Sequence, residues 1–133
     1  MDKLTEAVQI LIVEDEADFR SLLEMRLKRK GYSILSAASG EEALRLASDH
    51  TFDLALVDIR LPGMNGLQVL EVIRQLEPPP EVLMMTGHGT IETAIEAMRH
   101  GAYHYLAKPL DLKELEIVLM KALEKRRLTS HVS

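Results

Sequence analysis

Five short apolar segments alternate with longer segments of helical periodicity, and this alternation constrains the fold more than any other feature of the sequence. Several of the short segments are nearly continuous in apolar residues, as in Ile10–Val13 and Leu54–Val57. Such runs are typical of strands that are buried on both faces of a parallel sheet. We therefore predict strands at Val8–Val13, Tyr32–Ala37, Asp53–Asp58, Val82–Thr86 and Tyr103–Ala107.

The segments between these strands carry apolar residues at helical spacing, which predicts five helices. Gly31 is placed to end the first helix, and Pro78–Pro80 to stop the third. Ser39 with Glu42, and Asp111 with Glu114, resemble capping boxes at the starts of the second and fifth. The apolar positions expected to face the core are Phe19, Leu22, Leu23 and Leu27; Leu67, Leu70, Ile73 and Leu76; Ile91, Ala94, Ile95 and Met98; and Leu115, Val118, Leu119, Ala122 and Leu123.

A strand followed by a helix, repeated five times in 133 residues, fits one domain of parallel strands with right-handed crossovers. The predicted fold is α/β: a flavodoxin-like, doubly wound, five-stranded parallel sheet in the order 2-1-3-4-5, with helices on both faces. We expect the domain to comprise residues 1–127. Residues 128–133 have no apolar face of their own and are expected to form a tail or the start of a linker.

Polar residues follow four of the predicted strands at their carboxyl ends. They are Glu14, Asp15 and Glu16 after the first strand, Asp58 at the end of the third, Thr86 at the end of the fourth, and Lys108 after the fifth. Taken singly, each has an ordinary explanation as a turn aspartate, a strand threonine or a loop lysine. Taken together, they fall at one edge of the sheet, beside the point where the strand order reverses and where ligands bind in such folds.

The charges at this edge require compensation. At an effective dielectric near 20, two carboxylates about 4 Å apart repel each other by about 4 kcal/mol. Lys108 supplies one positive charge, and a hard divalent cation would supply two more. Oxygen ligands favour Mg²⁺, which commonly uses one or two protein carboxylates together with phosphate oxygens. The sequence therefore predicts a phosphoryl-transfer site.

Each residue then has an expected role. Asp58, at the end of a central strand, is the nucleophile that forms an acyl phosphate. Asp15 binds the metal, with Glu14 binding directly or through water, and the backbone carbonyl of Arg60 is a further candidate ligand. Lys108 neutralises one phosphoryl oxygen. Thr86 ends the fourth predicted strand, and its hydroxyl donates a hydrogen bond to another phosphoryl oxygen.

Four segments at these strand ends resemble the receiver domain of two-component response regulators: Ile10–Glu16, Leu56–Gly66, Met85–Gly89 and Gly101–Pro109. The resemblance covers roughly residues 8–127. It implies that Asp58 is the phosphoacceptor, that Glu14 and Asp15 are the acidic metal-binding pair, that Thr86 is the switch hydroxyl and that Lys108 contacts the phosphate. Glu14 stands where aspartate is also common in the family.

The resemblance also implies partners and a switch. A sensor histidine kinase would supply the phosphoryl group with Mg²⁺ present, and Tyr105 would be the aromatic residue that turns inward. The surface of the fourth helix, fifth strand and fifth helix would then change, and it or the last helix would support a weak or phosphorylation-dependent homodimer. Within the family, the segments from Thr86 and from Gly101 look most like NtrC-like regulators, which usually carry an AAA+ ATPase and a helix-turn-helix domain. No residues here encode either, so we expect an isolated receiver or part of a longer transcription regulator.

Three other functions are weighed against this one. A flavin-binding carrier of the same topology needs a Gly/Ser/Thr-rich phosphate loop, whereas Glu14–Glu16 would repel phosphate. An aspartate-nucleophile phosphatase typically has a second aspartate two residues after the first, where this chain has Arg60. We therefore expect no turnover enzyme. A phosphate-independent interaction module with the same fold remains as the alternative function.

Composition narrows the partners further. The formal net charge of −5 disfavours nucleic-acid binding by this segment, and Lys121, Lys125, Arg126 and Arg127 are interpreted as cations at a helix end. The absence of cysteine, of a signal-like start at residues 1–6 and of a membrane-length apolar run fits a cytoplasmic protein. His88 has two interpretations: an ordinary loop residue, which we favour, or a residue that tunes phosphate lifetime.

Overall fold

The computed structural model describes residues 7–87 and 91–132. Its strands are β1 (Gln9–Val13), β2 (Ser33–Ala37), β3 (Leu54–Asp58), β4 (Glu81–Thr86) and β5 (His104–Ala107). Its helices are α1 (Ala17–Arg29), α2 (Gly40–Asp49), α3 (Gly66–Ile73), α4 (Ile91–Arg99) and α5 (Leu112–Val132). Every predicted strand is present, and each end lies within one residue of its predicted position.

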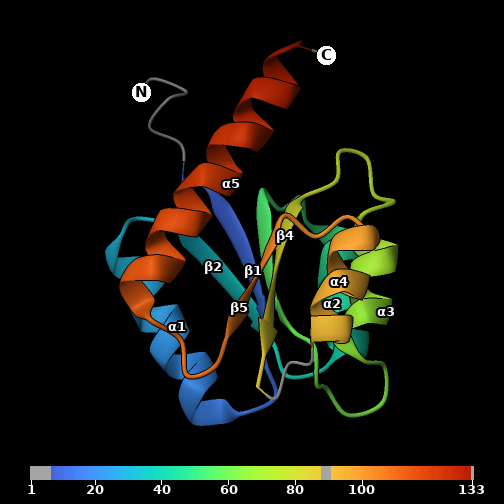
Figure 1. Ribbon diagram of the computed structural model, residues 1–133. Coiled ribbons are helices and arrows are strands. Elements are labelled where there is room, and N and C mark those ends of the chain that lie inside the picture. Colours follow the sequence, from blue (N-terminus) through green and yellow to red (C-terminus); the bar gives the residue numbers. More distant parts are fainter. Residues whose placement is uncertain (1–6, 88–90, 133) are drawn as a thin grey trace.

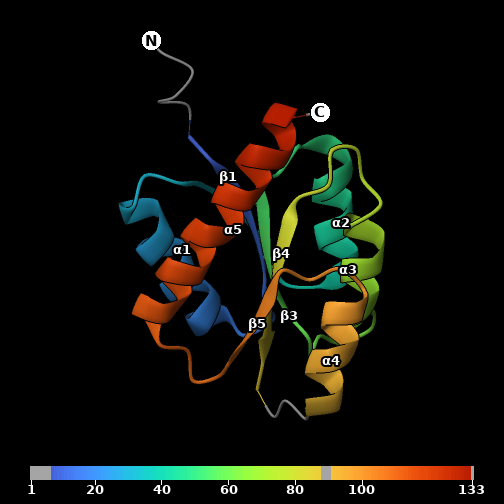
Figure 2. The same ribbon diagram turned by 45° about the horizontal axis from the view of Figure 1, so that its top comes forward.

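The five strands form one parallel sheet in the order β2-β1-β3-β4-β5, which confirms the predicted doubly wound topology. Helices α1 and α5 cover one face of the sheet, and α2, α3 and α4 cover the other (Figure 1). The turned view in Figure 2 shows the same three layers. Because β1 and β3 are neighbours at the centre, their carboxyl ends lie side by side where the strand order reverses.

Two apolar layers, one on each face of the sheet, make up the core. Along β3, Leu54 and Leu56 face α1 and α5, whereas Ala55 and Val57 face α2, α3 and α4. All four side chains are fully buried. The continuous apolar runs in the sequence are therefore explained by burial on both faces of the central strands.

Helix α4 is less buried than its sequence pattern predicted. Ala94 is buried, but Ile95 is 47% and Met98 is 42% exposed, so the prediction that they belong to the core is wrong. Leu22 on α1 is likewise exposed at the surface. Helix α4 packs beside β5, the edge strand of the sheet, and an edge strand covers only a narrow face of a neighbouring helix. The side chain of Ile91 lies outside the part of the chain that is described.

Several helix ends follow the predicted signals, and others do not. Gly31 has φ +94° after α1, a conformation that suits glycine. The Ser39 hydroxyl accepts from the Glu42 amide, but the Glu42 carboxylate accepts from Ala38 rather than from Ser39, so the capping box is incomplete. Asp111 caps α5 by accepting from the amides of the residues two and three positions later.

The start of α3 carries a capping box that the sequence analysis overlooked. The Asn65 side chain accepts from the Gln68 amide, and the Gln68 side chain accepts from the Asn65 amide. At its other end, α3 stops at Ile73, several residues before the prolines at 78–80. The complete box fixes the first turn of α3 immediately after the loop that follows Asp58.

Helix α5 continues to Val132, so the basic residues near 125 lie inside it and not at its end. Lys125 pairs with Glu81 at 3.3 Å, and the Arg126 side chain donates to the Phe52 carbonyl at 3.3 Å. These contacts attach α5 to the amino-terminal edge of the sheet. The helix is unbroken between residues 127 and 128, and the division into domain and tail at that point stays a prediction.

None of the helices in the described ranges 7–87 and 91–132 combines the length and the apolar character that a membrane crossing requires.

We predict that Gly66→Ala destabilises the fold. The Gly66 amide donates to the Ile59 carbonyl at 2.9 Å, and an added Cβ would lie 2.2 Å from the Asp58 carbonyl oxygen and 2.6 Å from the Ile59 Cα. Because both obstacles are backbone atoms, the loop must shift, at a cost of about 1–3 kcal/mol or more. Urea unfolding followed by circular dichroism measures this change.

Gly87→Ala is the matched control, because its Cβ would meet nothing closer than the Lys108 Cδ at 4.0 Å. Both substitutions restrict the unfolded chain equally, so the difference between them reports the clash. Equal urea midpoints for the two variants would contradict the prediction.

Candidate functional site

Three acidic side chains meet at the carboxyl edge of the sheet, where β1 and β3 end. Glu14 follows β1 and is fully buried, Asp58 is the last residue of β3 and is 4% exposed, and Asp15 is exposed. One carboxylate oxygen from each lies within 4.8 Å of the others. Among the residues that the structure describes, no other set of His, Cys, Asp or Glu side chains gathers in this way.

This acidic cluster fits a hard divalent cation. All three donors are carboxylate oxygens, the ligand type that Mg²⁺ and Ca²⁺ prefer. Asp15 also lines an open hollow with Arg60 and Asn65, so the cluster is reachable from outside. Three carboxylates and one neighbouring ammonium leave an excess of two negative charges when all are ionised. A divalent cation would neutralise that excess.

The neighbouring ammonium belongs to Lys108, which follows β5. Its Nζ lies 2.7 Å from the Glu14 Oε1 and 2.7 Å from the Asp58 Oδ2. The backbone amide of Lys108 donates to the Thr86 carbonyl at 2.8 Å, which ties the lysine to the end of β4. The structure therefore brings together the predicted residues from β1, β3 and the β5–α5 connection.

Burial and charge act against each other at this site. Burial raises the pKa of Glu14, because a buried carboxylate loses its hydration, and the hydrogen bond from Lys108 works in the opposite direction. Burial alone would lower the pKa of Lys108, but its hydrogen bonds to Asp58 and Glu14 outweigh that effect and raise it. The ammonium consequently stays charged at neutral pH and holds the two carboxylates together.

Backbone amides fix the remaining carboxylate oxygens. The Glu14 Oε2 accepts from the Glu16 amide at 3.0 Å, and the Asp58 Oδ1 accepts from the Arg60 amide at 2.9 Å. Nη1 of Arg20 donates to the Glu14 carbonyl at 2.8 Å from the first turns of α1. Arg20 was not singled out by the sequence analysis. Its position one helical turn after the acidic loop was the available signal.

The other predicted site residues lie nearby or on the adjoining surface. Thr86 ends β4 and is buried beside β3, where Asp58 is in register with Met85. Tyr105 lies on β5, is 40% exposed, and lines a hollow of about 330 Å³ with Ala94, Ile95, Met98 and Arg99 of α4. His88 lies outside the described residues.

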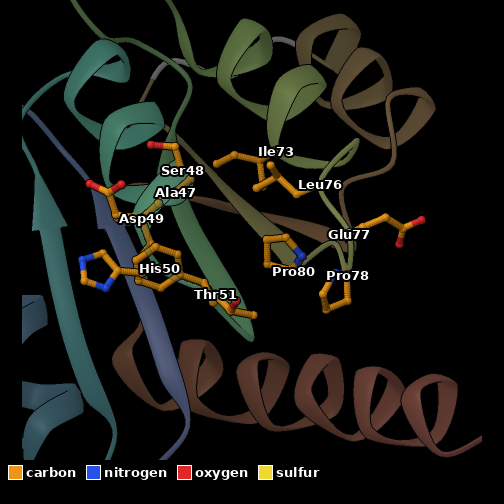
Figure 3. Close-up of a pocket in the computed structure, with 12 residues that line it drawn as sticks. Ala47, Ser48, Asp49, His50, Thr51, Ile73, Leu76, Glu77, Pro78 and Pro80 are labelled. Carbon is orange, nitrogen blue, oxygen red and sulfur yellow. The ribbon is translucent and has the colours of Figure 1, made fainter.

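A further hollow, of about 280 Å³, lies at the opposite end of the sheet (Figure 3). Ser48 of α2 and Thr51, which follows this helix, line one side of it, and Pro78 and Pro80 of the α3–β4 connection line the other. It contains none of the residues at the carboxyl edge of the sheet. The acidic cluster with Lys108 is therefore the candidate site.

Comparison with known proteins places this arrangement in a family. Residues 10–130 match the family model described as the response regulator receiver domain. The transcriptional regulatory protein ZraR of Escherichia coli strain K12 is 40% identical over 116 residues, which are 87% of this chain and 26% of ZraR. The chain thus spans about a quarter of the length of the curated relatives it matches.

Solved structures give the same result. A CheY-like receiver domain protein from Methanospirillum hungatei JF-1 superposes with a TM-score of 0.89 at 30% identity, covering 93% of this chain and 99% of that protein. NtrX from Brucella abortus superposes with a TM-score of 0.88 at 37% identity, covering 96% of this chain and 29% of NtrX.

ZraR and NtrX are regulators of the NtrC type, which confirms the subfamily likeness expected from the sequence. The family match extends over nearly all of the chain, and the sheet order and the carboxyl-edge cluster agree with it. The chain belongs to the response regulator receiver domain family.

Proposed function

We propose that Asp58 accepts a phosphoryl group from a sensor histidine kinase in a reaction that requires Mg²⁺, and that the resulting aspartyl phosphate controls an output domain or partner in transcription regulation. The observation that carries this proposal is the position of the Lys108 Nζ, 2.7 Å from both Glu14 and Asp58 inside a cluster of three carboxylates. A nucleophile, a cation for the phosphoryl oxygens and a metal-binding set are thereby adjacent.

The chemical step is a phosphoryl transfer between two covalent carriers. An Asp58 carboxylate oxygen attacks phosphorus and forms an O–P bond, while the bond from phosphorus to the donor's imidazole nitrogen breaks. The electron pair of that bond remains on the nitrogen. The Lys108 ammonium gives up its hydrogen bond to one Asp58 oxygen and donates to a phosphoryl oxygen instead. The Arg60 amide keeps the other Asp58 oxygen in place.

The metal-binding residues would be Asp15, Asp58 and Glu14, with the backbone carbonyl of Arg60 as a further ligand. Mg²⁺, when bound, supplies positive charge that offsets the charge developing on the phosphoryl oxygens. The exposed Asp15 carboxylate is accessible to an incoming ion, whereas Glu14 is buried and already bonded to Lys108. Glu14 would therefore bind the ion either directly or through a bridging water.

The switch residues would couple the site to a surface. The Thr86 hydroxyl would donate to the new phosphoryl group, drawing the end of β4 toward it. Tyr105 is exposed beside the hollow that it shares with α4, so its ring has room to change position. A new dianion at Asp58 would then bias the arrangement of α4, β5 and α5.

We propose a carrier of a phosphoryl group in preference to a turnover phosphatase. Arg60 stands two residues after Asp58, where such phosphatases have an acid/base aspartate, and a guanidinium cannot exchange protons at neutral pH. The Arg60 amide donates to Asp58, and its side chain is exposed. Loss of the phosphoryl group is therefore expected to be a slow self-catalysed hydrolysis.

The first test is phosphorylation by a small donor. Incubation with Mg²⁺ and acetyl phosphate should give a single-phosphoryl adduct in the intact mass of the wild-type protein, because the nucleophile and its cation are adjacent. Asp58→Asn should give none, since an amide is a far weaker nucleophile. Asp18→Asn is the control, because Asp18 is an exposed aspartate of α1 outside the acidic cluster.

The same variants can be offered a phosphorylated histidine-kinase domain, with transfer expected to wild type and to Asp18→Asn only. No adduct on the wild-type protein, or an equal adduct on Asp58→Asn, would refute the proposal. The first of these outcomes would favour a phosphate-independent interaction module.

The second test concerns the metal. Mg²⁺ that binds only the folded protein should raise the midpoint temperature of unfolding. The free energy of unfolding should rise by about 1.4 kcal/mol when the Mg²⁺ concentration is roughly ten times the dissociation constant. Asp15→Asn should raise the Mg²⁺ concentration needed for the same stabilisation by at least about tenfold, because loss of metal-site groups commonly weakens metal binding by that much. Thermal unfolding followed by circular dichroism, across a Mg²⁺ titration, measures it.

Glu16→Gln is the matched control for the metal test, since Glu16 is an exposed acid in the same loop but outside the cluster. It removes the same charge one position away and should leave the Mg²⁺ response intact. An identical response in the two variants would mean that general charge screening, and not coordination by Asp15, causes the stabilisation.

The third test addresses self-association. We propose a weak homodimer, promoted by phosphorylation, through the α4–β5–α5 surface or the last helix, because Ile95, Met98, Tyr105, Ile117 and Met120 are exposed there. Sedimentation equilibrium at equal protein concentrations should show association with a phosphate mimic and little without it. Ile95→Glu should abolish association through α4, whereas Met25→Glu, at an exposed apolar site on α1, should not.

Association that survives Ile95→Glu would assign the dimer to the last helix. A monomer with and without the phosphate mimic would contradict self-association altogether.

A further inference from the structure

The aromatic ring of Phe19 lies against the ammonium of Lys108. The distance from the Lys108 Nζ to the ring centroid is 4.9 Å. A cation within about 6 Å of an aromatic ring face is attracted by the ring's quadrupole, and the attraction strengthens when the cation is shielded from water. Phe19 belongs to α1 and Lys108 follows β5, so the fold creates this contact between segments distant in the sequence.

The other contacts of Lys108 show what the ring can add. Two of its interactions are the short hydrogen bonds to Glu14 and Asp58, and its side chain is mostly buried. An aromatic face attracts the ammonium without offering an oxygen that would compete with the carboxylates for its hydrogens. The ring can therefore restrain the ammonium while leaving its donors available to oxygen ligands.

We infer that Phe19 is a positioning residue for phosphoryl transfer, whose ring holds the Lys108 ammonium where it can exchange an Asp58 oxygen for an incoming phosphoryl oxygen. This inference rests on the proposed function of Asp58 and Lys108. The exchange replaces the hydrogen bond to the Asp58 Oδ2, but it does not require the ring contact to break. Lys108 thus keeps its contacts with the Phe19 ring and with Glu14 while its hydrogen bond to Asp58 is replaced.

Phe19 also packs against the apolar layer between the sheet, α1 and α5, so a purely structural role must be separated from this one. Phe19→Leu keeps an apolar side chain but removes the aromatic face. Phe19→Tyr keeps the aromatic face. Tyr32→Leu is the matched control, because Tyr32 packs against the same apolar layer. This substitution also removes an aromatic ring but leaves the contact between Phe19 and Lys108 intact.

The experiment measures the initial rate of adduct formation with acetyl phosphate and Mg²⁺ by intact mass, together with the urea midpoint of each variant. Phe19→Leu should slow the reaction roughly threefold to tenfold, which is the range that a partly shielded cation–ring contact supports. Phe19→Tyr should stay within about twofold of the wild-type rate. Tyr32→Leu should react like wild type. If Phe19→Leu fails to fold, Phe19→Met takes its place.

NMR provides a readout that does not depend on phosphorylation. The Lys108 side-chain methylene protons should show ring-current shifts in wild type and in Phe19→Tyr that disappear in Phe19→Leu. Equal rates for a folded Phe19→Leu and wild type, or equal losses in the Leu and Tyr variants, would overturn the role of Phe19 alone. Absence of any adduct in wild type would overturn the proposed function and this role with it.

Discussion

The ammonium of Lys108 between the buried Glu14 and Asp58 is the interaction on which the carboxyl edge of the sheet depends. The two hydrogen bonds, each 2.7 Å long, connect residues 94 and 50 positions apart in the chain. Two carboxylates this close would repel strongly in a region shielded from water. The attraction of the lysine to each carboxylate offsets this repulsion, so the ends of β1 and β3 can lie next to each other with both acids in place.

Much of the surrounding structure serves to fix the atoms of this group. The amides of Glu16 and Arg60 hold the outer carboxylate oxygens, and Arg20 holds the Glu14 carbonyl. Gly66 lets the first turn of α3 approach the Asp58 carbonyl more closely than any side chain would permit. Such backbone support leaves the carboxylates little freedom, and preorganised groups are what electrostatic stabilisation of phosphoryl transfer requires.

The face around α4 and β5 differs from the site in its physical character. At the site, Glu14 and Asp58 are buried and paired with Lys108. On α4, by contrast, Ile95 and Met98 are exposed beside Tyr105 and a shallow hollow. An apolar surface that the domain itself leaves uncovered, next to an edge strand, can be repacked at small cost. This contrast between a rigid site and an uncovered neighbouring face is the arrangement that a phosphorylation switch needs.

The sequence by itself determined the fold and most of the candidate site, because strands buried on both faces and polar residues at their carboxyl ends are local patterns. It predicted all five strands and their order, and it selected Glu14, Asp15, Asp58, Thr86 and Lys108. Periodicity marked Ile95 and Met98 as core, yet only the tertiary structure could decide their burial, since burial depends on how much of α4 the edge strand covers. The same holds for Phe19. It looks like an ordinary helix residue until the fold brings α1 against the Lys108 ammonium, across a separation in the chain that no local pattern encodes.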